Sequence, residues 1–261
     1  MKSKMALFDE ILEILQRKGY PMVEETYAKV QYFLEGLRDQ NQYQSLQDVR
    51  EWFQKQRNEC GMEVSKIGIN ELQNWKIDQK NGNIAHESGE FFTVIGVKVV
   101  STLRREVVGG WTQPMFDQRE GGILGVLCQN FNGVRHYLIH AKAEPGNINK
   151  ILLSPTLQAT FSNLKQAHGG KKPKFAEYFE TVEQQNTREN NKVNVLYSRW
   201  QTEDGGRFFL KSNKNMLVQL DEGEKIEIPP DYSWLTMYQL KQLLQNDNVV
   251  GHHLRSVISV L

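Results

Sequence analysis

The sequence has little cysteine, no excess of one charge and no long apolar run. Cys60 and Cys128 are its only cysteines, too few for a disulfide framework. No Cys-x-x-Cys pair is present, which disfavours a zinc ribbon or a redox pair. We expect both cysteines to pack in or near the core as small hydrophobic residues. The 32 basic residues nearly cancel the 31 acidic ones, so no overall field steers the chain toward nucleic acid.

The apolar residues are distributed as in a globular protein rather than in a membrane span. No stretch approaches the roughly 18 consecutive apolar residues that cross a bilayer. Lys2 and Lys4 precede a short apolar run, as in a signal peptide, but Asp9 and Glu10 interrupt it and no small-residue cleavage site follows. We therefore expect no membrane partner and a cytoplasmic location.

The first fifty residues have the periodicity of helices. Apolar residues in 5–18 share one helical face, and Gly19 and Pro21 end that segment. A second stripe predicts a helix over 23–38, and Ser45 followed by Asp48 predicts a capping-box start for a third. We expect residues 1–45 to be a helical extension that supplies a dimer contact, and residues 46–261 to be the main domain.

From about residue 84 the pattern becomes that of strands. Alternation predicts a strand over 92–99, and Asn132-Gly133 predicts a hairpin between 123–129 and 134–140. A turn at 204–206 predicts a second hairpin, between 193–200 and 207–211. Helices near 237–245, capped by Ser233 or Thr236, and over 252–261 close the chain. The expected fold class is α+β, with a largely antiparallel or mixed sheet flanked by helices.

Residues 154–163 are unusually polar and have two interpretations. As a strand, 156–162 would place the side chains of Thr156, Gln158, Thr160 and Ser162 on one face, where hydroxyl and amide groups suit recognition of a sugar. As a helix, the segment would use Ser154 as N-cap and Pro155 at its first position. The residues alone leave both open.

Several strings in this region, taken together and in order, resemble the NDP-hexose 2,3-dehydratase family. They are Trp111-x-Gln113-Pro114, Ala-Lys-x-Glu-Pro-Gly-Asn at 141–147 and Ser-Pro-Thr-x-Gln-Ala-Thr-x-Ser-Asn at 154–163. Similar segments at 82–92, 206–208, 213–216, 234–236, 247–248 and 255–257 extend the resemblance over most of 48–261.

The resemblance implies a fold and an activity. Family members remove the C2 hydroxyl and the C3 hydrogen from an NDP-4-keto-6-deoxyhexose, commonly a dTDP-sugar, and their Nudix-like unit usually occurs twice in tandem. This chain has one unit, so the resemblance implies that the pair of units is either made by a homodimer or absent. It lacks the R-E-x-x-E-E helix that holds magnesium in Nudix hydrolases, which disfavours diphosphate hydrolysis. Phe161 stands where many relatives would have a basic residue.

Dehydration next to a ketone needs a base, donors for the enolate and an acid for the leaving hydroxyl, but neither a redox cofactor nor a metal. We favour Glu144 as the base, with its pKa raised in a closed pocket, and His86 as the rival base or the acid. Tyr137 and Lys142 are candidate donors. Each of these residues also has an ordinary structural or surface interpretation. The unstable product implies coupling to a 3-ketoreductase.

The remaining candidates would bind the substrate. Basic side chains suit the diphosphate, an aromatic ring suits the nucleobase, and amides and hydroxyls suit the sugar. For the diphosphate they are Arg207, Lys211 and Lys214; for the base, Trp111; for the sugar, Gln113, Asn147, Gln158, Thr160, Ser162 and Asn163; Arg255 is either a pocket residue or a helix cap.

Two histidine pairs have the composition of metal ligands. His136 and His140 would lie about 13 Å apart on one strand, and His252 and His253, as neighbours on a helix, would not easily face one ion. We therefore predict no metal and no cofactor. Two other functions remain open: an NDP-sugar-binding protein without turnover, and an isomerase or epimerase that uses the same enolate.

Overall fold

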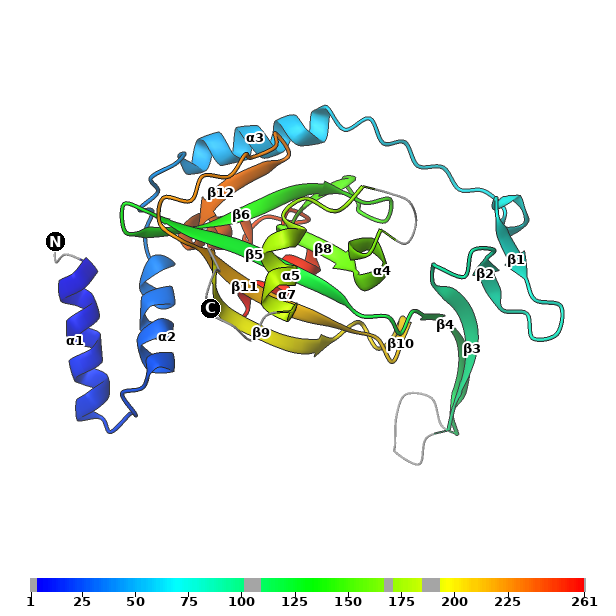
Figure 1. Cartoon of the computed structure of the whole chain (residues 1–261), viewed down its shortest axis with the longest axis horizontal. Coiled ribbons are helices and arrows are strands. Elements are labelled where there is room, and N and C mark those ends of the chain that lie inside the picture. The colour runs from blue at the N-terminus through cyan, green and yellow to red at the C-terminus, as the bar shows by residue number, and fades with distance from the viewer. Residues whose placement is uncertain (1–3, 101–108, 167–170, 185–192, 261) are drawn as a thin grey trace.

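The computed structural model describes residues 4–100, 109–166, 171–184 and 193–260. Three helices come first, α1 (Lys4–Arg17), α2 (Glu24–Glu35) and α3 (Leu46–Asn58). The predicted capping box is present: the Ser45 side chain accepts from the Asp48 N–H, and the Asp48 carboxylate accepts from the Ser45 N–H. In Figure 1, α3 lies along the main sheet, whereas α1 stands away from it beside α2.

The main sheet has seven strands. Its order is β12–β6–β5–β11–β9, with β7 paired to β6 and β8 paired to β5. Only β5 and β11 pair in parallel among these strands, so the sheet is mixed, as expected. The strands are β5 (Gly122–Phe131), β6 (Val134–Ala143), β7 (Ile151–Ser154), β8 (Leu157–Thr160), β9 (Val193–Thr202), β11 (Ser212–Leu220) and β12 (Tyr232–Thr236).

One predicted hairpin is confirmed and the other is wrong in its pairing. Asn132 and Gly133 join β5 to β6 with φ of 50° and 75°. Beyond the turn at 204–206, however, β9 pairs with β11 and not with 207–211. The Glu203 N–H donates to the Lys211 carbonyl at 3.0 Å. This bond closes a loop over 203–211, so strand pairing begins only at Ser212.

A second, five-stranded sheet lies to one side of the main sheet (Figure 1). It is built from β1 (Trp75–Ile77), β2 (Ile84–His86), β3 (Thr93–Val99), β4 (Trp111–Asp117) and β10 (Phe208–Phe209). Rings of Phe92, Phe116 and Phe208 form a continuous aromatic contact across it, with centroid separations of 4.8 and 5.6 Å. The strand β10, from the 203–211 loop, ties this sheet to the main one.

Helices cover both faces of the main sheet, which confirms the α+β class. Successive residues of β5 alternate between two cores: Leu124 and Val126 face α3, α6 (Met237–Leu243) and α7 (His252–Ile258), whereas Ile123 and Leu127 face α4 (Phe161–Leu164) and α5 (Ala176–Gln184). The predicted closing helices are therefore α6 and α7, and Thr236, not Ser233, caps α6.

The helix α2 is fastened to the body through its last turn. The Tyr137 hydroxyl donates to Glu35 at 3.2 Å, and both side chains are buried. Gln44, just before α3, donates to Ser233 and to the Trp234 carbonyl. By contrast, α1 packs on α2, with the Phe8 and Tyr27 rings 6.5 Å apart. Within the described ranges, none of the helices has the length and apolar character of a membrane span.

Candidate functional site

A polar pocket of about 630 Å³ lies where the two sheets meet. Its walls come from the ends of β6, β8 and β11, the 203–211 loop, and the first turn of α7. Its volume is within the range of small-molecule sites. The lining residues are Gln118, Leu124, Lys142, Glu144, Gly146, Asn147, Gln158, Ala159, Thr160, Asn163, Glu203, Phe208, Lys211, Asn213, His252 and His253.

The polar segment that the sequence left open is a strand followed by a helix. Residues 157–160 form β8, so the helix capped by Ser154 is wrong, and Thr160 caps α4 instead. Gln158 and Thr160 line the pocket. Thr156, two residues earlier, is buried in the sheet, where its hydroxyl donates to the Leu138 carbonyl and accepts from the Leu127 N–H. The polar row therefore divides between the pocket and the core.

Lys142, Glu144 and Gln158 form one wall. The Lys142 Nζ and the Gln158 Nε2 both donate to Glu144 Oε1, at 2.9 and 3.0 Å. Burial alone would raise the pKa of Glu144, but the charge and hydrogen bond of Lys142, with His253 and Gln158, lower that pKa overall. The expected rise in the pKa of Glu144 is therefore wrong, because its neighbours stabilise the ionised form more than burial destabilises it.

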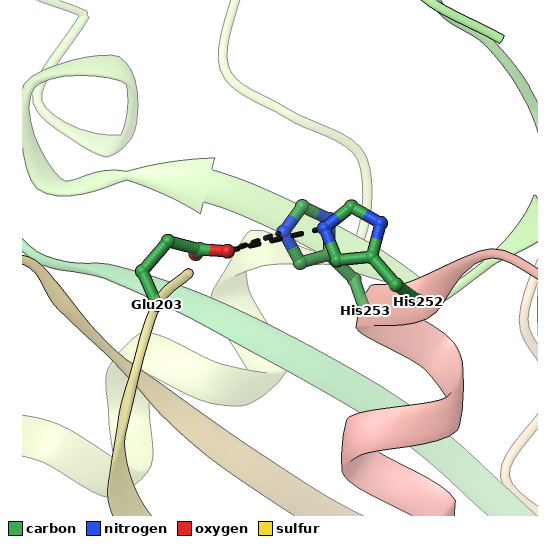
Figure 2. Close-up of side chains that lie close together, drawn as sticks. All are labelled: Glu203, His252 and His253. Carbon is green, nitrogen blue, oxygen red and sulfur yellow. Dashed lines mark hydrogen bonds and ion pairs between the residues drawn. The ribbon is translucent and has the colours of Figure 1, made fainter. Parts of the chain in front are cut away.

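Glu203 and the histidines of α7 form a second wall of the pocket, and Figure 2 shows both rings directed toward the Glu203 carboxylate. Glu203 Oε1 lies 3.4 Å from His253 Nε2 and 3.9 Å from His252 Nε2. The Asn213 amide donates to the other oxygen, Oε2. The Glu203 side chain is only 8% exposed. The hydrogen bond from His253 is the largest of the effects that lower the pKa of Glu203, so its carboxylate is ionised near neutral pH.

The chain brings the two histidines to this wall through a short bridge. Val250 pairs with Leu153 of β7, and the Gly251 N–H donates to the Leu153 carbonyl at 2.8 Å. Gly251 then caps α7, which places His252 and His253 at the first two helical positions. A Cβ at residue 251 would come within 3.1 Å of the Leu153 carbonyl oxygen. The glycine thus permits the close approach that positions both rings.

The prediction that His252 and His253 would not easily face one ion is wrong. Glu203, His252 and His253 each place one ligand atom within 4.8 Å of the other two, because the rings of the two histidines turn toward the same carboxylate (Figure 2). Two imidazoles and a carboxylate can hold a divalent transition ion such as zinc or iron. His136 and His140 are separate: His136 accepts from the Gln42 N–H, and His140 pairs with Asp231.

Lys211 is the buried cation of the pocket. It is 8% exposed, and its ammonium donates to Gln118 and lies 4.9 Å from the centroid of the Phe208 ring. Burial lowers the pKa of Lys211, and the carboxylates of Glu203 and Glu120 oppose that effect. A buried cation that lines a pocket suits a phosphate ligand.

Two predicted catalytic residues lie elsewhere. Tyr137 is fully buried in the core and donates to Glu35, so it is a structural residue under α2 and not an enolate donor. His86 is on β2 of the small sheet, where Nδ1 is 2.8 Å from Ser88 Oγ and the ring packs edge-on against Trp75. Neither side chain lines the pocket.

Several predicted binding residues also lie outside the pocket lining. Trp111 donates to Gln113 at 2.8 Å, and Gln113 donates to the Gly206 carbonyl at 3.0 Å, so this pair fastens β4 to the 203–211 loop. Ser162 is within 3.0 Å of Thr160 but does not line the pocket. The others outside the lining are the exposed Arg207 and Arg255 and the half-buried Lys214.

Seven predicted residues do come together: Lys142, Glu144, Asn147, Gln158, Thr160, Asn163 and Lys211. Sequence reasoning missed Gln118, Glu203, Phe208, Asn213, His252 and His253. Asn213 belonged to a segment of the resemblance, and the adjacent histidines were a visible signal. No sequence signal pointed to Glu203, because only the fold brings the end of β9 against the start of α7.

The fold and the pocket define an α+β protein with a polar ligand site that carries charges of both signs. The chain belongs to the NDP-hexose 2,3-dehydratase family, whose sequence model matches residues 46–261. It is 38% identical over 210 residues to the dTDP-4-dehydro-6-deoxy-alpha-D-glucopyranose 2,3-dehydratase of Saccharopolyspora spinosa, covering 80% of this chain and 41% of that protein. The enzyme of the same name from Amycolatopsis orientalis is 38% identical over 218 residues, 82% and 44% of the two chains. The chain thus spans less than half the length of these relatives.

Among solved structures, the chain is similar to an ADP compounds hydrolase, with 10% identity over 77% of this chain and 94% of that one and a TM-score of 0.37. An Ap4A hydrolase from C. elegans matches with 14% identity over 53% and 92% of the two chains and a TM-score of 0.29. With TM-scores below 0.5, neither likeness by itself says anything about the ligand or the reaction.

Proposed function

We propose that the pocket binds an NDP-4-keto-6-deoxyhexose and removes water across C2 and C3. The observation that carries this proposal is the meeting of Lys142, Glu144 and Gln158 in one pocket wall, because all three come from the strings that resemble the dehydratase signature. The family membership and the names of the relatives support the same reaction. A dTDP-sugar is the first substrate to test, since those relatives are named for one.

The chemistry assigns a task to Lys142. The C4 ketone acidifies the C3 hydrogen, and loss of that proton places negative charge on the C4 oxygen. A fixed cationic donor stabilises this charge most in a pocket that excludes water. The Lys142 side chain is 25% exposed and is held by Glu144 at 2.9 Å. Lys142 therefore donates to the enolate oxygen, and Glu144 positions it.

The remaining lining residues suit the rest of the substrate. Lys211 is the cation for the diphosphate, and Asn147, Thr160 and Asn163 offer hydrogen bonds to sugar or phosphate oxygens. Gln158 Oε1 has no hydrogen-bond partner within the described part of the chain, so a substrate hydroxyl would satisfy it. Position 161 holds a phenylalanine and not a basic residue, and Lys211 supplies a positive charge to the pocket from the 203–211 loop instead.

The reaction can be tested directly with the purified protein. Incubation with dTDP-4-keto-6-deoxyglucose should give a product lighter by one water, or free dTDP with a sugar breakdown product, in the time course of a mass spectrum. Including a 3-ketoreductase should trap the unstable product as a stable deoxysugar, which is the functional coupling that we propose. Substrate that binds but stays unchanged would favour a binding protein, and a change of configuration without loss of water would favour an epimerase.

We also propose that two copies of this chain form a homodimer in which α1 supplies a contact. The chain covers 41% and 44% of the length of the two relatives, and a second copy of the chain would supply a second unit. The α1–α2 pair carries exposed apolar side chains, including Met5 at 75%, Ile14 at 44% and Phe33 at 53% exposed. Burial of such side chains is the usual driving force of association.

Deletion of residues 1–22 should therefore convert the dimer to a monomer. This deletion removes α1 but keeps Glu35 and Gln44, which fasten the following segment to the body. Light scattering should show the molar mass falling by half, with the far-ultraviolet circular dichroism of the main domain retained. A dimer of unchanged stability after the deletion would rule out α1 as the contact, and a monomeric full-length chain would refute the dimer.

A further inference from the structure

The two walls of the pocket differ in their fitness to accept a proton. Glu144 Oε1 already accepts hydrogen bonds from Lys142 and Gln158, and its pKa is lowered. A carboxylate in this state is a weak base toward a carbon acid. The residue that the sequence suggested as the base is therefore the less suitable one in the pocket.

The second wall, formed by Glu203 and the histidines of α7, has the arrangement of a base and its orienting group. His253 lines the pocket, its side chain is 18% exposed, and Nε2 lies 3.4 Å from Glu203 Oε1. The Asn213 amide donates a hydrogen bond to the second oxygen of Glu203, which fixes the orientation of the carboxylate. A buried carboxylate that accepts a hydrogen bond from one imidazole nitrogen fixes the tautomer of the neutral ring, with the lone pair on the other nitrogen, and fixes the orientation of the ring. A hydrogen bond of 3.4 Å is at the long end of the range, which is usual in such pairs before substrate binds.

We propose that His253 is the base of the dehydration and that Glu203 positions it, a role that rests on the proposed function. The Nδ1 nitrogen of His253 takes the proton from C3, and the electrons of that C–H bond form the C3–C4 double bond of an enolate whose oxygen is bound by Lys142. The enolate then reforms the C4 ketone, a C2–C3 double bond forms, and the C2–O bond breaks. The imidazolium of His253 returns its proton to the departing hydroxide, which leaves as water.

His252 is less suited than His253 to act as the base. Its side chain is 62% exposed and its Nε2 lies 3.9 Å from Glu203, farther than that of His253. An exposed ring with a looser partner is less well oriented. The two adjacent imidazoles thus provide a comparison within one pocket, since they differ mainly in burial and in contact with Glu203.

The charges of the pocket favour this role over a metal site. The charge of Lys211 is among the effects that lower the pKa of Glu203, and Glu144 pairs directly with Lys142 at 2.9 Å. A divalent ion placed between the histidines and Glu203 would share that carboxylate with the Lys211 ammonium, which repels it.

The test compares His253→Gln, His252→Gln and Glu203→Gln with the wild-type protein. In D2O, the base step is measured by NMR as deuterium uptake at C3 of dTDP-4-keto-6-deoxyglucose, turnover by mass spectrometry, and dTDP affinity by calorimetry. We expect His253→Gln to slow deuterium uptake and turnover by about 100-fold or more, with dTDP affinity retained. His252→Gln should lose less than about tenfold. Glu203→Gln should lower kcat with little change in KM, and Glu203→Asp should restore part of it.

The outcomes separate this proposal from the function on which it rests. A wild-type protein that dehydrates no 4-keto-6-deoxyhexose nucleotide would refute the proposed function, and the base role with it. A working wild type with His253→Gln exchanging deuterium at the wild-type rate would refute the base role alone. The base role alone would also be refuted by one equivalent of transition metal that mass-spectrometric metal analysis finds in the wild type and that is lost in both His253→Gln and Glu203→Gln.

Discussion

Replacing Glu144 by Gln should lower the turnover of the dehydration by at least about 100-fold and leave nucleotide binding nearly unchanged. The Glu144 carboxylate holds the Lys142 ammonium at 2.9 Å. An amide has nearly the same shape but no charge, so Lys142 loses the partner that keeps it directed into the pocket. The loss falls on the transition state because negative charge on the C4 oxygen appears only there.

This prediction requires a kinetic separation and a control. Steady-state turnover should give a lower kcat with a similar KM, and calorimetry with dTDP should give a similar Kd. Glu144→Asp, which keeps the charge, should recover part of the activity. Glu25→Gln removes a comparable carboxylate that pairs with Lys29 at 2.6 Å on α2, outside the pocket, and should have no effect on turnover. Normal turnover in Glu144→Gln would remove Glu144 from the mechanism.

Local signals in the sequence determine much of the fold. The capping box at Ser45 and Asp48 and the turn at Asn132-Gly133 depend only on residues close in sequence, and the structure has both. The β9 pairing was wrong because the turn at 204–206 is a local signal inside a longer loop. The Glu203–Lys211 backbone bond, which closes that loop, decides the register of β9. A turn signal cannot reveal where pairing resumes.

Prediction of the site succeeded where the functional groups lie close in sequence. Lys142 and Glu144 are two residues apart at the end of one strand, and the resemblance marked both. The second wall joins Glu203 to His253, fifty residues later, because the bridge between Leu153 of β7 and Val250 places the start of α7 beside Glu203. Helical spacing alone predicted that His252 and His253 would not easily face one ion. Spacing does not describe how both rings rotate toward Glu203, which lies on another element. The prediction for Tyr137 was wrong for a different reason. A polar group on a strand does not show which face of the sheet packs against the core.

The small sheet shows that residues in a family signature need not touch a ligand. Trp111 and Gln113 belong to one of the strings that carry the resemblance, yet their hydrogen bonds run to each other and to Gly206. Through the Gly206 carbonyl they hold the loop that begins at Glu203 and ends at Lys211. The signature at 111–114 therefore acts on the pocket indirectly, by fixing the loop that carries two of its charged residues.

Replacing Glu35 by Ala should destabilise the protein by about 3 kcal/mol, the size of loss seen when one partner of a buried charge pair is removed. Glu35 and Arg135 are 5% and 7% exposed. Burial opposes the charge on Arg135, but Glu35, together with nearby groups, keeps the pKa of Arg135 above its usual range. Without Glu35, the guanidinium stays buried with its charge uncompensated, and the Tyr137 hydroxyl loses its acceptor.

Urea and thermal denaturation would measure this loss, with a fall in Tm of about 10 °C for a chain of this size. Glu24→Ala, an exposed position on the same helix, is the matched control and should change stability by less than about 0.5 kcal/mol. The double variant Glu35→Leu with Arg135→Met should recover most of the loss, because two apolar side chains leave no buried charge unpaired. If Glu35→Ala were no less stable than the control, α2 would not be fastened to the body through this network. The proposed division of the N-terminal segment into a fixed α2 and an associating α1 would then be wrong.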